Sequence, residues 1–147
     1  MDRPLPVIDE MSSPYWEGAR EHRLVLLRCP DCRVFVHPPR PSCPRCRSER
    51  LDPEEVTGRG QVYSWSVMRS PGNPGFEGRL PYAVLVVELA EQPGLFTIGN
   101  VVDCPLEDIE IGMSVEVTWE RIDDTITLPQ WRPAQTVGSG SAGASRA

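Results

Sequence analysis

The chain has 147 residues, enough for one domain of ordinary size or for a small module joined to a compact second domain. With 39% hydrophobic and 24% charged residues, its composition is that of a globular protein rather than a disordered one. The longest apolar run, residues 83–87, is far shorter than the roughly 20 residues of a membrane-spanning helix, and the first residues lack the pattern of a signal peptide. We therefore expect a cytoplasmic protein with no membrane association.

The net charge of −6 is unevenly distributed. Residues 20–50 hold eight arginines and three acidic residues, whereas residues 51–147 hold six arginines and fourteen acidic residues. A basic N-terminal part followed by an acidic body offers a local site for an anion, although a solvated basic face gives the same pattern.

The first 28 residues predict an arm, a helix and a strand. Residues 1–11 are rich in proline and predict an extended arm. A helix is expected to begin at Ser12, with a hydroxyl cap and with Pro14 in its first turn, and to continue past Trp16. Residues 23–28 are mostly apolar, with little alternation between polar and apolar side chains, and they predict a short strand.

Two CxxC motifs follow this strand and give the strongest signal in the sequence. Cys29 and Cys32 form the first pair, and Cys43 and Cys46 form the second after a ten-residue spacer. Two thiolates two residues apart hold one side of a tetrahedral ion, so two such turns facing each other make a four-sulfur site for Zn²⁺. Because sulfur fills all four positions, such a metal is structural. His37 lies between the pairs and is expected to be a bystander.

Redox chemistry, disulfides and iron are the alternatives to zinc for these four cysteines. A redox CxxC normally stands alone beside a βαβ pattern, which is missing here. Two disulfides would need an oxidising compartment. Iron in a rubredoxin-type site uses the same four ligands, so the sequence leaves iron open as the alternative metal. The fifth cysteine, Cys104, is expected to be a small buried residue at a strand end.

Residues 51–57 have the composition of a linker, and an all-β pattern follows them. Five short strands with glycine-containing breaks predict a mainly β protein, in which an N-terminal helix and a rubredoxin-like zinc ribbon precede a five-stranded OB-fold barrel. We expect the ribbon in residues 1–50, the barrel in 51–134 and a disordered Gly/Ser/Ala-rich tail in 135–147. The expected strands of the barrel are 61–68, 81–89, 95–102, 113–120 and 125–131.

The order of motifs resembles a known family. A capped helix with Tyr-Trp precedes CxxC, Pro-Pro-Arg and a second CxxC, and the later motifs are Gly-x-Gly-x-Val-Tyr-Ser, Pro-Tyr-Ala-Val-x-Val-Glu-Leu and Ile-Gly-Met-x-Val-x-Val. Over about residues 8–134 this is similar to the OB-fold proteins with an N-terminal rubredoxin-like zinc ribbon, a domain-of-unknown-function family associated with acyl-CoA enzymes.

The resemblance implies a non-catalytic zinc-containing subunit. Such proteins bind and stabilise thiolase-like enzymes, including lipid-transfer-protein-like aldolases that cleave steroid side chains, and they help to accommodate CoA. Zinc would be held by Cys29, Cys32, Cys43 and Cys46. Arg40 and Arg69 are candidates to contact CoA phosphate, and acyl-CoA would be a ligand shared with the partner in a hetero-oligomer. Five aromatic residues are candidates for the partner interface: Tyr15, Trp16, Tyr63, Trp65 and Trp131.

The residues themselves agree with a non-catalytic role. The chain has two histidines, and neither stands in a pattern that pairs a nucleophile with a base. A nucleic-acid-binding zinc-ribbon and OB module is the alternative, since both folds serve that purpose. The acidic barrel and the complete lack of lysine argue against it, because a groove that follows a nucleic-acid backbone needs positive potential. An independent enzyme is the least favoured hypothesis.

Overall fold

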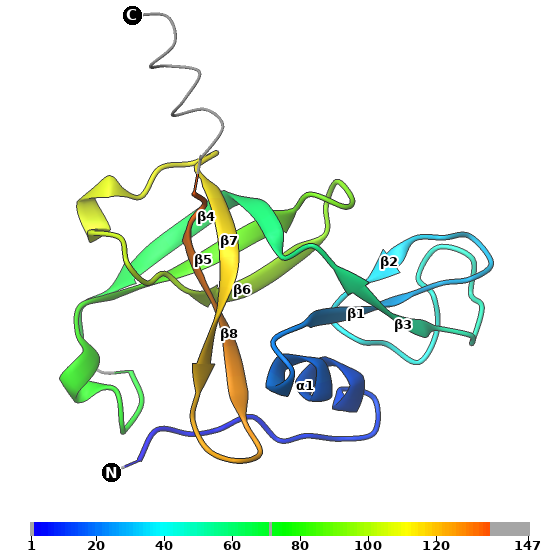
Figure 1. The fold of residues 1–147 in the computed structure, drawn as a ribbon, viewed down its shortest axis with the longest axis horizontal. Helices are drawn as coiled ribbons and strands as arrows, with labels where there is room; N and C mark the ends of the chain where they lie inside the picture. Colours follow the sequence, from blue (N-terminus) through cyan, green and yellow to red (C-terminus); the bar gives the residue numbers. More distant parts are fainter. Residues whose placement is uncertain (1, 71, 136–147) are drawn as a thin grey trace, which may run out of the picture.

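The computed structural model describes residues 2–70 and 72–135, and the fold is mainly β (Figure 1). One helix and a three-stranded sheet form the N-terminal part, and a five-stranded sheet forms the rest. The predicted fold class is confirmed. No helix within the described ranges is long and apolar enough to cross a membrane. The predicted disordered tail lies outside these residues, except for residue 135.

The N-terminal part contains helix α1 (Ser13–Arg20) and strands β1 (Leu24–Arg28), β2 (Phe35–Val36) and β3 (Asp52–Val56). Antiparallel pairing gives the order β2-β1-β3. The helix packs directly on the strand that follows it, since a Cβ atom on Gly18 would lie 2.6 Å from a methyl of Val25. A larger residue at position 18 would therefore push α1 away from the ribbon.

Two local predictions in this part are wrong. Residues 51–57 are not a linker, because Asp52–Val56 pairs along its whole length with β1. The backbone ladder with β1 holds this acidic strand, and Arg28 Nη1 lies 2.7 Å from Glu54 Oε2 beside it. Ser12 occupies the N-cap position but its hydroxyl does not cap the helix. It accepts a hydrogen bond from the Asp9 N–H at 3.1 Å instead.

The barrel follows the strand order β6-β5-β4-β7-β8. A parallel bridge between Val101 and Trp131 joins the end of β6 to β8 and closes the sheet on itself. This closure is the OB-fold arrangement that the five predicted strands indicated. The elements of the barrel are β4 (Arg59–Met68), the 3₁₀ turn η1 (Glu77–Arg79), β5 (Tyr82–Leu89), β6 (Phe96–Asn100), the 3₁₀ turn η2 (Leu106–Asp108), β7 (Ser114–Arg121) and β8 (Thr127–Pro133).

The ribbon and the barrel share one hydrophobic core. Leu24 and Leu26 of β1, together with Phe35 of β2, belong to the same buried cluster as Leu85 and Trp131 of the barrel. The side chain of Gln92, in the β5–β6 turn, also accepts a 2.8 Å hydrogen bond from the Phe35 N–H. The predicted division between residues 50 and 51 stays a prediction, because this core extends across it.

Candidate functional site

The four cysteines lie in two turns with the same hydrogen-bond pattern. In the first turn the Arg33 N–H donates to the Cys29 carbonyl at 2.8 Å, and in the second the Arg47 N–H donates to the Cys43 carbonyl at 2.9 Å. Arg33 and Arg47 both adopt a φ of 68°. Each CxxC sequence thus folds into the same tight knuckle, and the two knuckles present their sulfurs to each other.

The four sulfurs have the geometry of a tetrahedral metal site. All of them lie within 4.8 Å of one another. Cys29 Sγ lies 3.5 Å from Cys46 Sγ, and Cys32 Sγ lies 3.5 Å from Cys43 Sγ. A tetrahedron with Zn–S bonds of about 2.3 Å has sulfur–sulfur edges of about 3.8 Å, whereas a disulfide requires about 2.05 Å. The spacing therefore fits a four-thiolate metal ion and not a pair of disulfides.

Backbone amides favour the thiolate form that a metal requires. The N–H of Cys32 lowers the pKa of Cys29, with a further contribution from the N–H of Asp31. The N–H of Cys46 lowers the pKa of Cys43 to about 7, and the Arg45 N–H, 3.4 Å from the sulfur, contributes to this shift. Hydrogen bonds to the charged form stabilise it, so the first thiol of each knuckle is prepared to lose its proton to a cation. At Cys46 the Ser48 N–H also lowers the pKa, but desolvation and the neighbouring sulfurs outweigh this effect and raise the pKa to about 12.

A carboxylate joins the two knuckles outside the sulfur cluster. Asp31, in the first knuckle, accepts hydrogen bonds from the Ser48 hydroxyl and the Arg50 guanidinium, both just beyond the second. These two contacts hold the pKa of Asp31 below its usual value. The link fixes the knuckles relative to each other, although the exposed ion pair adds little stability by itself.

The two arginines proposed to contact CoA lie far apart. The segment between the knuckles, which contains Arg40, lies at the ribbon end of the molecule in Figure 1, and the segment that follows β4, which contains Arg69, lies at the opposite end. Arg40 lines a shallow groove of about 430 Å³ that also contains Glu10 and Glu49. Arg69 is exposed and forms no ion pair within the residues that the structure describes. A single phosphate group therefore cannot contact both arginines.

The five candidate interface aromatics separate into three classes. Trp131 is fully buried and fills the core, so it cannot contact a partner. Tyr63 and Trp65 are exposed on β4, with 55% and 37% of their surfaces accessible. Tyr15 and Trp16 are partly buried and pack edge to face, with ring centroids 4.9 Å apart.

An apolar groove of about 580 Å³ runs along the seam between α1, the ribbon and the outer face of the barrel. Tyr15 and Pro38 line one side, and Phe96 and Ile98 of β6 line the other. His37 stacks on Tyr15 at 5.3 Å, and burial lowers the pKa of His37 to about 4. Its Nδ1 atom is buried and has no hydrogen-bond partner in the described chain. His37 is therefore a neutral packing residue, which agrees with its expected role as a bystander to the metal.

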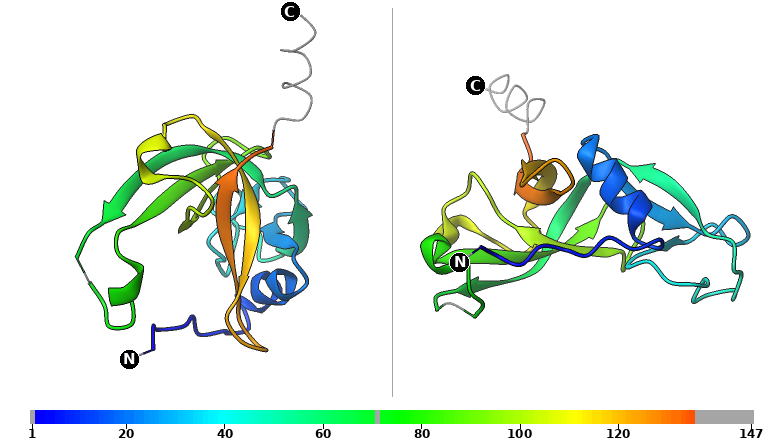
Figure 2. Two further views of the ribbon diagram at one scale, coloured as in Figure 1. Left: turned by 60° about the vertical axis from the view of Figure 1, so that its left-hand side comes forward. Right: turned by 90° about the horizontal axis from the view of Figure 1, so that it is seen from below.

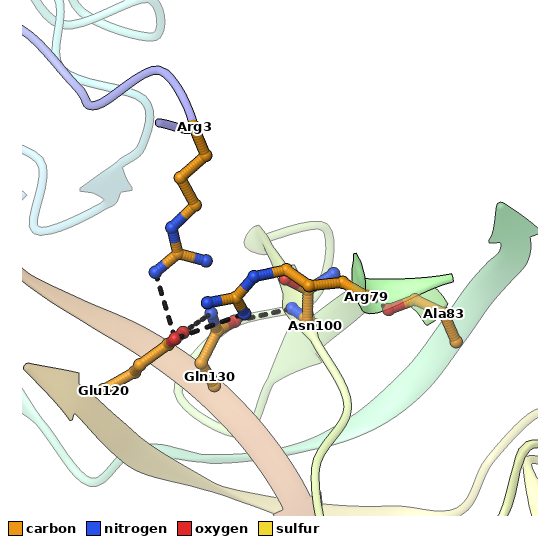
Figure 3. A network of polar contacts seen from close by, with 6 residues as sticks. All are labelled: Arg3, Arg79, Ala83, Asn100, Glu120 and Gln130. Carbon is orange, nitrogen blue, oxygen red and sulfur yellow. Dashed lines mark hydrogen bonds and ion pairs between the residues drawn. The ribbon is translucent and has the colours of Figure 1, made fainter. Parts of the chain in front are cut away.

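Sequence reasoning missed a polar centre at Glu120 (Figure 3). The Glu120 carboxylate accepts hydrogen bonds from Arg3 at 3.0 Å, from Arg79 at 3.4 Å and from the Gln130 side chain at 2.8 Å. Partial burial raises the pKa of Glu120, but Gln130 and the two arginine charges together hold it below its usual value. The centre ties the N-terminal arm and the segment before β5 to the β7–β8 hairpin. No local motif marks it, because Arg3 lies 117 residues before Glu120 in the chain.

Family models, related sequences and a solved structure each match most of this chain. Family models for the ChsH2 rubredoxin-like zinc ribbon domain and the ChsH2 C-terminal OB-fold domain match residues 16–52 and 53–120. The chain is 44% identical over 132 residues to a probable enoyl-CoA hydratase alpha subunit of Thermomonospora curvata, covering 90% of this chain but only 40% of that protein. It is 35% identical over 118 residues to a DUF35 domain-containing scaffold protein of Methanocaldococcus jannaschii, covering 79% and 82% of the two chains. A solved structure described as Ltp2-ChsH2(DUF35) aldolase matches with a TM-score of 0.80 and 42% identity, covering 89% of this chain and all of that one.

Proposed function

The chain belongs to the DUF35 family, with a ChsH2-type zinc ribbon and OB-fold, and from this membership we propose that it is a non-catalytic, zinc-containing subunit of an acyl-CoA enzyme. The observation that carries the proposal is the match to the full length of a chain from an aldolase complex. Relatives named as a hydratase alpha subunit and as a scaffold protein support the same role.

Zinc is the metal proposed for the four-sulfur site. Cys29, Cys32, Cys43 and Cys46 would hold it, and it would supply structure rather than chemistry because no coordination position is left open. The match to a zinc ribbon family supports zinc over iron. Metal analysis of the purified chain tests this assignment, with one zinc per chain expected and iron as the result that would replace it.

Catalysis is assigned to the partner. His22 stacks on Trp119 with ring centroids 5.6 Å apart, and His37 is neutral and partly buried, so both imidazoles are used in packing. The partner that the resemblance implies is a thiolase-like aldolase of the lipid-transfer-protein type, acting on a steroid acyl-CoA. Co-expression with the thiolase-like aldolase of the same organism tests this directly. We expect one stable species in size-exclusion chromatography with light scattering, and separate elution of the two proteins would refute the proposal.

Arg40 and Arg69 are proposed as alternative contacts for CoA phosphate, because one phosphate group cannot reach both. Arg69 is the better candidate, because Glu10 and Glu49 share the groove of Arg40 and oppose an anion there. In the assembled complex, Arg69→Ala should weaken acyl-CoA affinity several-fold, as loss of a charge-assisted contact does. Arg59→Ala is the matched control, since Arg59 is an exposed barrel arginine without an ion pair among the described residues. Unchanged affinity in Arg40→Ala and Arg69→Ala would refute only the phosphate contact.

A further inference from the structure

Strand β4 is paired on both sides for only part of its length. Its first three residues, 59–61, pair with β7, and Val62 exchanges hydrogen bonds with Met113 and Gly112 just before β7 begins. A β-bulge leaves Tyr63 unpaired, and from Ser64 to Met68 only β5 pairs with the strand. Figure 2 shows the β4–β5 hairpin curving away from the β7–β8 pair, which leaves this half of β4 as an edge of the sheet.

The register identifies the backbone groups on this edge. Trp65 lies opposite Leu85 and Val67 lies opposite Ala83 on β5. The Ala83 carbonyl is directed to the other side of β5, where it accepts a 3.0 Å hydrogen bond from the Asn100 side chain. Because N–H and C=O groups of one residue point to the same side in an antiparallel ladder, Trp65 and Val67 direct theirs away from β5. No hydrogen bond satisfies these four groups in the part of the chain that the structure describes.

Of the features with which proteins usually protect an open strand, this edge, residues 63–68, has a β-bulge at its start, at Tyr63, but neither charge nor proline. Each of residues 63–66 is exposed. Other strands in the described ranges do carry such features. Strand β3 carries Pro53 and three acidic residues, β2 is two residues long, and the bridge at Val101 joins the end of β6 to β8. Unlike β3, the open half of β4 carries neither charge nor proline. Residues 96–98 of β6, which pair only with β5, share this property but line the groove beside Tyr15 and Trp16 of α1.

We propose that an extended strand of the partner aldolase subunit pairs with this edge and continues the sheet. The inference rests on the proposed function, which makes this chain one subunit of a hetero-complex and so requires a contact surface. A strand of about five residues would satisfy the backbone of Trp65 and Val67. Uncharged side chains on that strand would pack against Tyr63 on one face and the Trp65 indole on the other, since the edge offers no charge to pair.

Hydrogen exchange of the wild-type subunit, free and in the purified complex, tests the inference without a mutation. Amides in residues 63–68 should exchange at least tenfold more slowly in the complex, because the edge N–H groups become bonded. Residues 127–133 of β8 serve as the internal control, since β8 is already paired. Unchanged exchange at 63–68 in a complex that forms would overturn the inference and leave the proposed function intact, whereas failure of any complex to form would overturn the proposed function.

A proline substitution removes the edge donor itself. Val67→Pro should weaken assembly at least tenfold, measured by titration of the aldolase subunit, while zinc content and the unfolding transition of the free chain show that it folds. Ser66→Ala is the matched control, because its backbone pairs with β5 and its side chain is exposed. Equal affinity of a folded Val67→Pro and wild type would refute the inference. A concentration-dependent homodimer of the free chain with protected residues 63–68 would assign the edge to a second copy instead.

Discussion

Burial of His37 should make the stability of the protein depend on pH in a defined window. The pKa of this imidazole falls from about 6.5 in the unfolded chain to about 4 in the fold, because burial beside Tyr15 disfavours the charged form. Below about pH 6.5 the unfolded state therefore binds a proton that the folded state does not, so stability is lost as the pH falls and levels off below about pH 4. Linkage gives a loss of about 1.2 kcal/mol between about pH 7 and pH 5.5.

Urea unfolding, followed by tryptophan fluorescence at both pH values, measures this loss against the variant His37→Phe. Phenylalanine keeps a ring to stack on Tyr15 but cannot titrate, and any constant cost of its size cancels when only the difference between the two pH values is compared. Zinc content is measured in parallel to confirm that the metal stays bound. An equal pH dependence in wild type and variant would show that the His37 imidazole is solvated and does not pack in the seam beside Tyr15.

Three further predictions concern the metal, the core and the polar centre. Cys43→Ser should abolish binding of one zinc per chain by elemental analysis, whereas Cys104→Ser, outside the sulfur cluster, should leave metal content unchanged; equal loss in both would contradict the assignment. Gly99→Ala should destabilise the fold by about 1–3 kcal/mol in urea, because its methyl would lie 2.9 Å from a core indole, while Gly78→Ala has nothing within 4 Å and should stay within about 0.5 kcal/mol of wild type. Glu120→Gln should speed proteolysis of the N-terminal arm without unfolding the barrel, because the arm loses its 3.0 Å ion pair; unchanged cleavage would show that different contacts hold the arm.

The motifs with the strongest sequence signals gave the most accurate structural predictions. Each CxxC motif determines the turn that it forms, so the cluster of four sulfurs could be predicted from the two motifs and their spacing. The period-two patterns predicted the bounds of β4 and β7 to within two residues. The prediction was wrong where pairing depends on a distant neighbour. Asp52–Val56 contains a proline and three acids and has little intrinsic strand preference, yet it becomes a strand because all five residues pair with β1 and Val56 is buried in the shared core.

Features that depend on closure of the barrel could not be predicted. Trp131 looked like an interface residue because sequence alone does not show that β8 closes on the end of β6 and buries that indole completely. The Glu120 centre required Arg3, from the far end of the chain, to meet the β7–β8 hairpin. The open half of β4 has the same alternating sequence pattern as a strand that is paired on both sides. That it is an edge could not be predicted, because this depends on which strands lie beside it.

Strand β1 connects the metal to the barrel through its two faces. Leu24 and Leu26 belong to the barrel core, while Leu27 packs in the separate cluster that contains Cys29 and Cys43. The free energy of metal binding is consequently part of the stability of the whole subunit and not of a detachable finger. We expect zinc starvation in a cell to lower the amount of this protein through degradation of the metal-free form, and thereby to limit how much of its partner enzyme can be assembled.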